Sequence, residues 1–178
     1  YKRPPSALRR RSVAEAPAGS ALEAGVTLRL RYRPLYDWPA MLNHLAARAI
    51  AGVEQVEPDA AGGVYRRTVA VEGGLGTVEV RHEAARCGLA VTVRVPCVRA
   101  LPAVLGGVRR VFDLGADIGA IGAHLAEDPF LAPLVAERPG LRAPGGWDGF
   151  ELATRAILGQ QVSVAAARRL AGQLVQLC

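Results

Sequence analysis

The chain has 178 residues, 51% of them hydrophobic, and a formal net charge of +6 at pH 7. This composition suits one hydrophobic core, or a small domain with part of a second, and argues against disorder over most of the chain. No run approaches the roughly 20 apolar residues of a membrane span, so we expect a cytoplasmic protein with no membrane partner. Because residues 1–11 hold five of the six net charges, bulk charge gives no argument for nucleic-acid binding by the rest of the chain.

The beginning of the chain differs in composition from the rest. Residues 1–11 are rich in basic side chains and contain no acid, and the first residue is Tyr1 instead of methionine, which suggests a fragment. Residues 12–25 are rich in Ala, Gly, Ser and Glu and show no periodicity. That composition predicts a flexible linker ahead of a folded unit.

The folded unit begins with a strand and a helix. From Val26 to Arg33 apolar and polar residues alternate, which predicts a half-buried strand. Over Trp38 to Ala49 the apolar period lengthens to that of a helix. Asp37 can cap this helix, and Pro39 is tolerated in its first turn.

Three more runs with a period of two follow, at residues 65–71, 78–80 and 89–95. The glycine-containing turns 72–74 and 86–88 are short enough to join neighbouring runs as antiparallel hairpins. A strand, a helix and at least three further strands predict a small α+β layer.

Beyond the strands the chain turns helical. An apolar stripe from Leu101 to Phe112 ends at Gly115, and Asp117 can cap a short helix that reaches Leu125. Residues 137–146 are rich in Pro and Gly and therefore predict a loop and a plausible domain boundary.

Two amphipathic helices, at residues 150–158 and 164–177, are joined by a polar elbow. Gln160 and Gln161 stand in this elbow, where glutamine has no special advantage, so each is a candidate for contact with something outside the fold. Alternatively, one glutamine bonds to backbone groups and the other is solvated. Ser163 can cap the second helix.

The cysteines give no sign of a metal site or a disulfide framework. Their number is odd and their spacing fits neither, so we interpret them as buried thiols and expect no metal and no cofactor. They are Cys87, Cys97 and Cys178.

Four ordered patches resemble the AlkA family, the 3-methyladenine DNA glycosylase II type of helix-hairpin-helix glycosylase. They lie at residues 36–49, 110–114, 138–142 and 146–165, within a similarity that runs from about Leu28 to Cys178. Four patches in the expected order are far more specific than any one of them.

The resemblance implies an α+β fold in two parts. Residues 26–114 would form a small antiparallel sheet with two helices, like the TATA-binding protein, and residues 115–178 the first helices of an all-α helix-hairpin-helix domain. Residues 1–11 resemble the end of an AraC-type helix-turn-helix, which precedes the glycosylase in fusions with an Ada/AraC-type regulator; a solvated basic tail is the alternative. Within residues 1–11, the candidate contacts to DNA phosphates are Arg9, Arg10 and Arg11.

The activity implied by the resemblance is hydrolytic excision of N-alkylated purines, such as 3-methyladenine, from double-stranded DNA. Alkylation places positive charge on the purine and makes it a good leaving group, so the enzyme must chiefly expose the base and stabilise an electron-poor sugar. Flipping the base out of the stack costs a few kcal/mol, and an inserted side chain can hold the gap open.

The resemblance also assigns site residues. It places the inserted side chain at Gln161, with Gln160, Val162 and Ser163 beside it at the minor groove. His44 stands where the family contributes an aromatic side chain to the base pocket. Imidazole can stack on a base, but a protonated ring would repel a cationic one. The alternative is that His44 is only a residue on the flank of its helix.

We expect no catalytic residue in this chain. The family's hairpin and its catalytic aspartate correspond to positions beyond Cys178, so the chain as it stands should be inactive. The catalytic position is matched by none of Asp113, Asp117, Asp128 and Asp148. The competing hypothesis is a non-enzymatic DNA-binding transcriptional regulator, or its effector domain.

Overall fold

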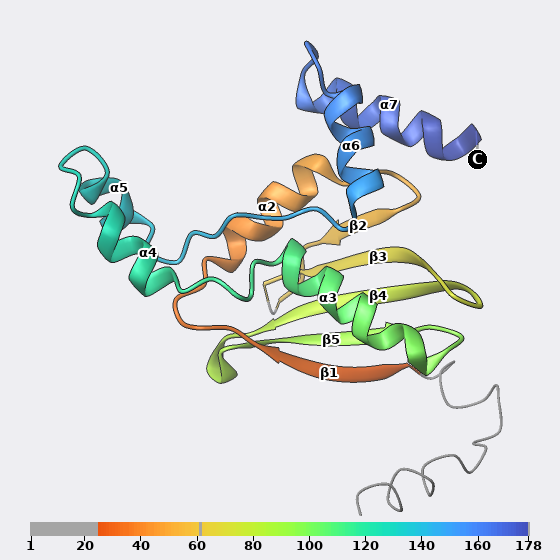
Figure 1. Cartoon of the computed structure of the whole chain (residues 1–178), viewed down its shortest axis with the longest axis horizontal. Helices are drawn as coiled ribbons and strands as arrows, with labels where there is room; N and C mark the ends of the chain where they lie inside the picture. The colour runs from red at the N-terminus through yellow and green to blue at the C-terminus, as the bar shows by residue number, and fades with distance from the viewer. Residues whose placement is uncertain (1–24, 61, 178) are drawn as a thin grey trace, which may run out of the picture.

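The computed structural model describes residues 25–60 and 62–177, and Figure 1 shows one sheet with α3 lying across it and α2, α6 and α7 beyond its β2 edge. The sheet is antiparallel with strand order β1-β5-β4-β3-β2. Its strands are β1 (Val26–Arg31), β2 (Glu54–Glu57), β3 (Val64–Val71), β4 (Gly74–Glu83) and β5 (Gly88–Arg94). The helices are α2 (Trp38–Arg48), α3 (Leu101–Val111), α4 (Ile118–Leu125), α5 (Ala132–Glu137), α6 (Gly149–Leu158) and α7 (Val164–Leu177), with short 3-10 turns η1 (Ala84–Arg86) and η2 (Val98–Ala100).

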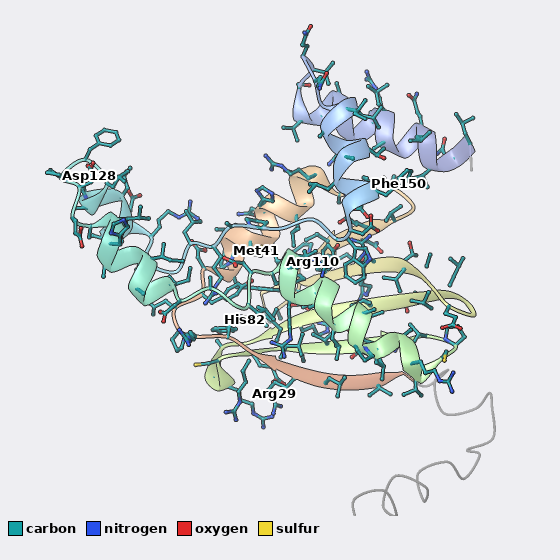
Figure 2. All side chains as sticks on the ribbon, viewed as in Figure 1. Arg29, Met41, His82, Arg110, Asp128 and Phe150 are labelled. Atoms are coloured by element: carbon teal, nitrogen blue, oxygen red, sulfur yellow. The ribbon has the colours of Figure 1, made fainter. Side chains whose placement is uncertain are left out.

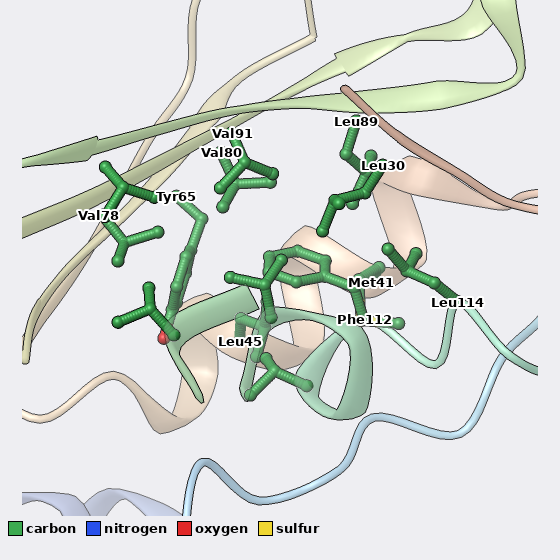
Figure 3. Packing of buried hydrophobic residues seen from close by; sticks show 14 of the residues in the cluster. Leu30, Met41, Leu45, Tyr65, Val78, Val80, Leu89, Val91, Phe112 and Leu114 are labelled. Carbon is green, nitrogen blue, oxygen red and sulfur yellow. The ribbon is translucent and has the colours of Figure 1, made fainter. Parts of the chain in front are cut away.

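The sheet has one buried and one exposed face because its strands alternate. Val91 and Val93 of β5 are fully buried and pair with Val80 and Val78 of β4, so the four side chains share a face. Helices α2 and α3 cover that face, and Figure 3 shows the side chains of the sheet meeting those of the helices. The sheet and the two helices that cover it, here called the sheet layer, confirm the α+β class.

Two elements were not anticipated from the sequence. Strand β2 has only four residues, three of them polar or charged, and it forms because it pairs with β3 at the edge of the sheet. Helix α5 has only six residues, with Pro133 in its first turn. Both are too short to show a period, and both depend on neighbours in space.

The predicted helix caps are confirmed. The Asp37 carboxylate accepts the Ala40 amide at 2.9 Å at the start of α2. Asp117 caps α4 in the same way, and the Ser163 hydroxyl accepts the Ala166 amide at 3.2 Å at the start of α7. Side chains therefore satisfy amides that the first turn leaves without helical partners.

Residues 138–148, here called the return segment, form the predicted loop but lie bound to the sheet layer. The Asp37 amide donates to the Gly140 carbonyl at 2.8 Å. The buried Arg142 guanidinium donates to the carbonyls of Asp113 and Leu35 at 2.6 and 3.1 Å. The return segment belongs to the second predicted domain but is hydrogen-bonded to elements of the first. The predicted domain boundary at residue 114 therefore stays a prediction.

Some expectations concern segments outside the described residues, namely the basic start, the linker up to residue 24, and Cys178. The expectation of buried thiols needs correction for Cys87 and Cys97, which are free but partly exposed. Cys87 lies in the left-handed turn before β5, which places it at the edge of the core. Among the described residues, no helix has both the length and the apolar character to cross a bilayer.

Candidate nucleic-acid interface

The elbow between α6 and α7, residues 159–163, carries two exposed glutamines. Gln161 adopts a left-handed backbone with φ +59°, which costs a side-chain-bearing residue about 1–2 kcal/mol. Within the described part of the chain, the side chains of Gln160 and Gln161 have no hydrogen-bond partner. The Gln160 main-chain amide donates to the Ile157 carbonyl at 3.3 Å, and both side chains are solvated here. A contact of the glutamines with something outside the fold stays a prediction.

The elbow lies at the C-terminal end of α2. Val162 of the elbow lines a shallow pocket of about 200 Å³ together with Arg48, Ile50 and Arg168. The Arg155 guanidinium of α6 donates to the Arg48 carbonyl at 2.9 Å, which ties the two helix ends together. The position of the elbow is therefore set by the sheet layer.

An ion cluster of Glu54, Arg67, Glu151 and Arg155 fastens α6 to the sheet. Arg67 donates to Glu151 at 2.7 Å, and Arg155 lies 2.5 Å from Glu54 and 2.8 Å from Glu151. The side chains of Arg67 and Glu54 are only 3% and 7% exposed. Burial opposes the charge of Arg155, but Glu54 and Glu151 outweigh it and raise its pKa above the ordinary value.

The Trp147 ring completes this region. The Arg67 guanidinium stacks over it with 4.1 Å between the guanidinium carbon and the ring centroid. A side chain at Gly107 of α3 would come within 2.8 Å of the same ring, so this glycine makes room for it. Sequence reasoning identified neither the ion cluster nor Trp147. The available signal was Arg67 itself, which occupies an inward position between Tyr65 and Val69.

His44 lies half-buried on α2 and lines a pocket of about 360 Å³ with Trp147, Leu152 and Arg155. Burial lowers the pKa of its imidazole, and the nearby Arg48 lowers it further. Both effects favour the neutral imidazole, which would not repel a cationic base. Since Arg48 and Arg155 also line the elbow pocket, the structure places His44 and the elbow in adjacent sites.

The aspartates have structural roles. Asp117 and Asp148 cap α4 and α6. Asp128 accepts the Phe130 amide at 2.7 Å, and Asp113 accepts the Ala143 amide at 3.2 Å. Arg9, Arg10 and Arg11 lie outside the described residues.

The sequence model described as the AlkA N-terminal domain matches residues 27–148. The chain belongs to this family. The match covers the sheet layer, helices α2 to α5 and the return segment, and it ends at the residue that caps α6.

Curated relatives of this AlkA-family chain are longer than the chain itself. It is 38% identical over 173 residues to a Mycobacterium tuberculosis (strain CDC 1551 / Oshkosh) protein named probable bifunctional transcriptional activator/DNA repair enzyme AlkA, which covers 96% of this chain and 33% of that protein. It is 38% identical over 148 residues to DNA-3-methyladenine glycosylase 2 of Escherichia coli (strain K12), covering 83% of this chain and 49% of that one. The chain thus spans between a third and about half of these relatives.

A solved structure shares the fold of this AlkA-family chain. The 3-methyladenine DNA-glycosylase from Archaeoglobus fulgidus superposes with a TM-score of 0.71 at 21% identity. The superposition covers 84% of this chain and 50% of that one. It extends well beyond the sheet layer and supports the fold.

Proposed function

We propose that the chain forms the first part of a DNA repair glycosylase that excises N-alkylated purines, such as 3-methyladenine, from double-stranded DNA by base flipping. Its family supports this proposal, as do the names of the two curated relatives, which match 83% and 96% of the chain. The observation that carries it is the exposed elbow, whose two glutamine side chains are free to contact DNA within the described structure.

In this proposal the elbow enters the minor groove. Gln161 fills the space left by the flipped nucleotide, and Gln160, Val162 and Ser163 lie against the neighbouring base pairs. The left-handed backbone of Gln161 supports this role, because strained residues concentrate at functional sites. His44 would pack against the extruded base, as a neutral ring suited to a cationic purine.

The chain supplies binding groups in this proposal and not the catalytic carboxylate. Each aspartate named above is bonded to a backbone amide, so none is offered to a sugar cation. The cationic purine leaves with the bonding electron pair, and water attacks the sugar carbon and completes the hydrolysis. We expect the 178-residue chain alone to release no base.

The test is release of free 3-methyladenine from methylated duplex DNA by the complete gene product that contains this chain. We expect release, and we expect the Gln161→Gly substitution to lower its rate by about tenfold or more. Glycine adopts the left-handed conformation without strain, so this change removes the side chain and preserves the elbow.

The control is Glu72→Gly, at an exposed position in the turn between β3 and β4. It should excise at the unaltered rate. The wedge assignment fails if Q161G and E72G excise equally well, and the proposed activity fails if the unaltered gene product releases no alkylated base.

A second candidate function is transcriptional regulation without catalysis. The name of the Mycobacterium tuberculosis relative, which joins a transcriptional activator to a repair enzyme, favours it. A gene product that activates a reporter promoter after alkylation but releases no base would support the regulator. Activation together with base release would indicate that both functions occur in one polypeptide.

A further inference from the structure

The positive charge of the folded part gathers at one place. Residues 25–151 carry fourteen arginines and fourteen acidic residues and are neutral at pH 7. Residues 152–177, which contain the elbow, α7 and most of α6, carry three arginines and no acid. The net charge of the described residues therefore lies on the segment that carries the elbow.

Not all of these arginines are available to a partner. Arg155 is neutralised by Glu54 and Glu151 in the ion cluster. Arg168 and Arg169 are exposed and have no ion pair with any residue that the structure describes. Arg168 makes one long hydrogen bond, from Nη1 to the Ala46 carbonyl at 3.4 Å.

A third available arginine comes from α2. Arg48 is exposed and has no acidic partner among the described residues, and its Nη1 donates to the His44 carbonyl at 3.5 Å. Arg48 and Arg168 line the pocket beside Val162 of the elbow. Arg168 and Arg169 line the adjacent groove, which lies between α7 and the segment from the end of α2 to β2. We call Arg48, Arg168 and Arg169 the arginine strip.

We propose that the arginine strip binds phosphates of the DNA backbone beside the nucleotide at which the elbow acts. The inference rests on the proposed function and names the contact surface that it requires. A guanidinium presents five donors in a planar fork that fits a phosphate, and the long bonds of Arg48 and Arg168 leave most of those donors free. Residues 152–177 contain no acid. Glu54 lines the groove with Arg168 and Arg169, but its side chain is 7% exposed and its charge is balanced by Arg67 and Arg155.

The salt dependence of DNA binding tests the proposal. Fluorescence anisotropy gives the Kd of the complete gene product for a labelled undamaged duplex over a range of sodium chloride concentrations. The double substitution Arg168→Gln and Arg169→Gln should reduce the slope of log Kd against log salt by about 1.8, because each phosphate contact contributes about 0.9. An unchanged slope overturns the proposal.

Two matched variants distinguish a local phosphate-binding site from an effect of overall net charge and from a disturbance of the structure. Arg94→Gln with Arg99→Gln removes the same charge from exposed positions on β5 and η2 and should leave the slope unaltered. Arg168→Lys with Arg169→Lys keeps the charge and should keep most of the slope. The proposal fails if the two glutamine pairs act alike, or if the lysine pair loses as much as its glutamine counterpart.

This experiment and base release can fail separately. A reduced slope in a gene product that releases no base would leave the arginine strip as a DNA-binding surface without the proposed catalysis. Base release with an unchanged slope would support the glycosylase activity and contradict DNA binding by the arginine strip.

Discussion

Arg67 is a charged residue at an inward position of a sheet, and its surroundings explain why it is tolerated. Glu54 and Glu151 balance its charge, and Trp147 covers the guanidinium. Removing one member of such a cluster leaves a buried charge without compensation, which costs more than the cluster itself contributes.

We therefore expect Arg67→Ala to lower the free energy of unfolding by about 3–5 kcal/mol. Urea unfolding followed by tryptophan fluorescence measures the change. Arg31→Ala is the control, because Arg31 is exposed and forms no ion pair within the described structure, and it should change stability by less than about 0.5 kcal/mol. Similar values for the two variants would contradict the importance of the cluster.

His82 gives the fold a dependence on pH. Its Nε2 lies 2.7 Å from the Tyr32 hydroxyl and its ring stacks on Trp38. Burial lowers the pKa of His82, which is labelled in Figure 2, below 6.5. On acidification the unfolded chain takes up the proton first, so the free energy of unfolding falls as pH drops below about 6.5. His44 contributes in the same direction.

The substitution His82→Gln should make that decline shallower, as measured by urea unfolding at a series of pH values between about 7 and 5. His124→Gln is the control, since His124 is exposed on α4. Equal pH slopes for the unaltered chain and H82Q would show that His82 does not contribute.

At the scale of elements, α3 contains two neighbouring glycines, of which Gly106 has room for a side chain and Gly107 has none. A Cβ atom at Gly107 would lie 2.8 Å from the Trp147 ring, whereas at Gly106 the nearest atom is the end of Arg110 at 3.8 Å. Alanine favours a helix interior over glycine by about 1 kcal/mol wherever there is room for its methyl group.

Gly106→Ala should therefore raise the free energy of unfolding by up to about 1 kcal/mol, while Gly107→Ala should lower it by about 1–3 kcal/mol through overpacking. Thermal unfolding of the two variants provides the comparison. A stabilised G107A would mean that Trp147 can move away without loss.

Local patterns explain which elements could be predicted from the sequence. Alternation revealed β1 and β3 to β5, and capping residues revealed the start of α2, α4 and α7, because each signal lies within a few residues. The edge strand β2 and the ion cluster depend on residues far apart in the chain: Arg67 and Glu151 are 84 positions from each other.

At the candidate site too, the sequence predicts local features but not contacts between distant residues. The glutamines of the elbow could be identified from the sequence because they interrupt two apolar helices. Its place at the end of α2, next to the pocket of His44, could not be, because α2 and α6 meet only through contacts such as that between Arg155 and the Arg48 carbonyl.

At the scale of the whole molecule, α6 and α7 expose apolar side chains. Phe150 of α6, labelled in Figure 2, is 85% exposed, and Ile157 and Leu177 are also exposed. Contiguous apolar surface promotes association. We expect the chain to self-associate as its concentration rises and to bind a hydrophobic dye, in sedimentation velocity and dye fluorescence respectively.

Phe150→Ser combined with Ile157→Ser should reduce both effects. Leu75→Ser is the matched control, because Leu75 is 79% exposed at an isolated position on β4 and should not matter. A monodisperse unaltered chain that binds no dye would contradict the expectation.

The charges that anchor α6 cancel one another, two arginines against two glutamates. Arg67 and Glu54 are almost completely shielded from solvent, and Arg155 and Glu151 are partly shielded. Mobile ions screen exposed charges over about 8–10 Å at ordinary ionic strength but reach such shielded groups poorly. Concentrated salt should thus detach the molecule from a polyanion while the two helices keep their orientation. Dissociation would then leave a surface already shaped for the next encounter.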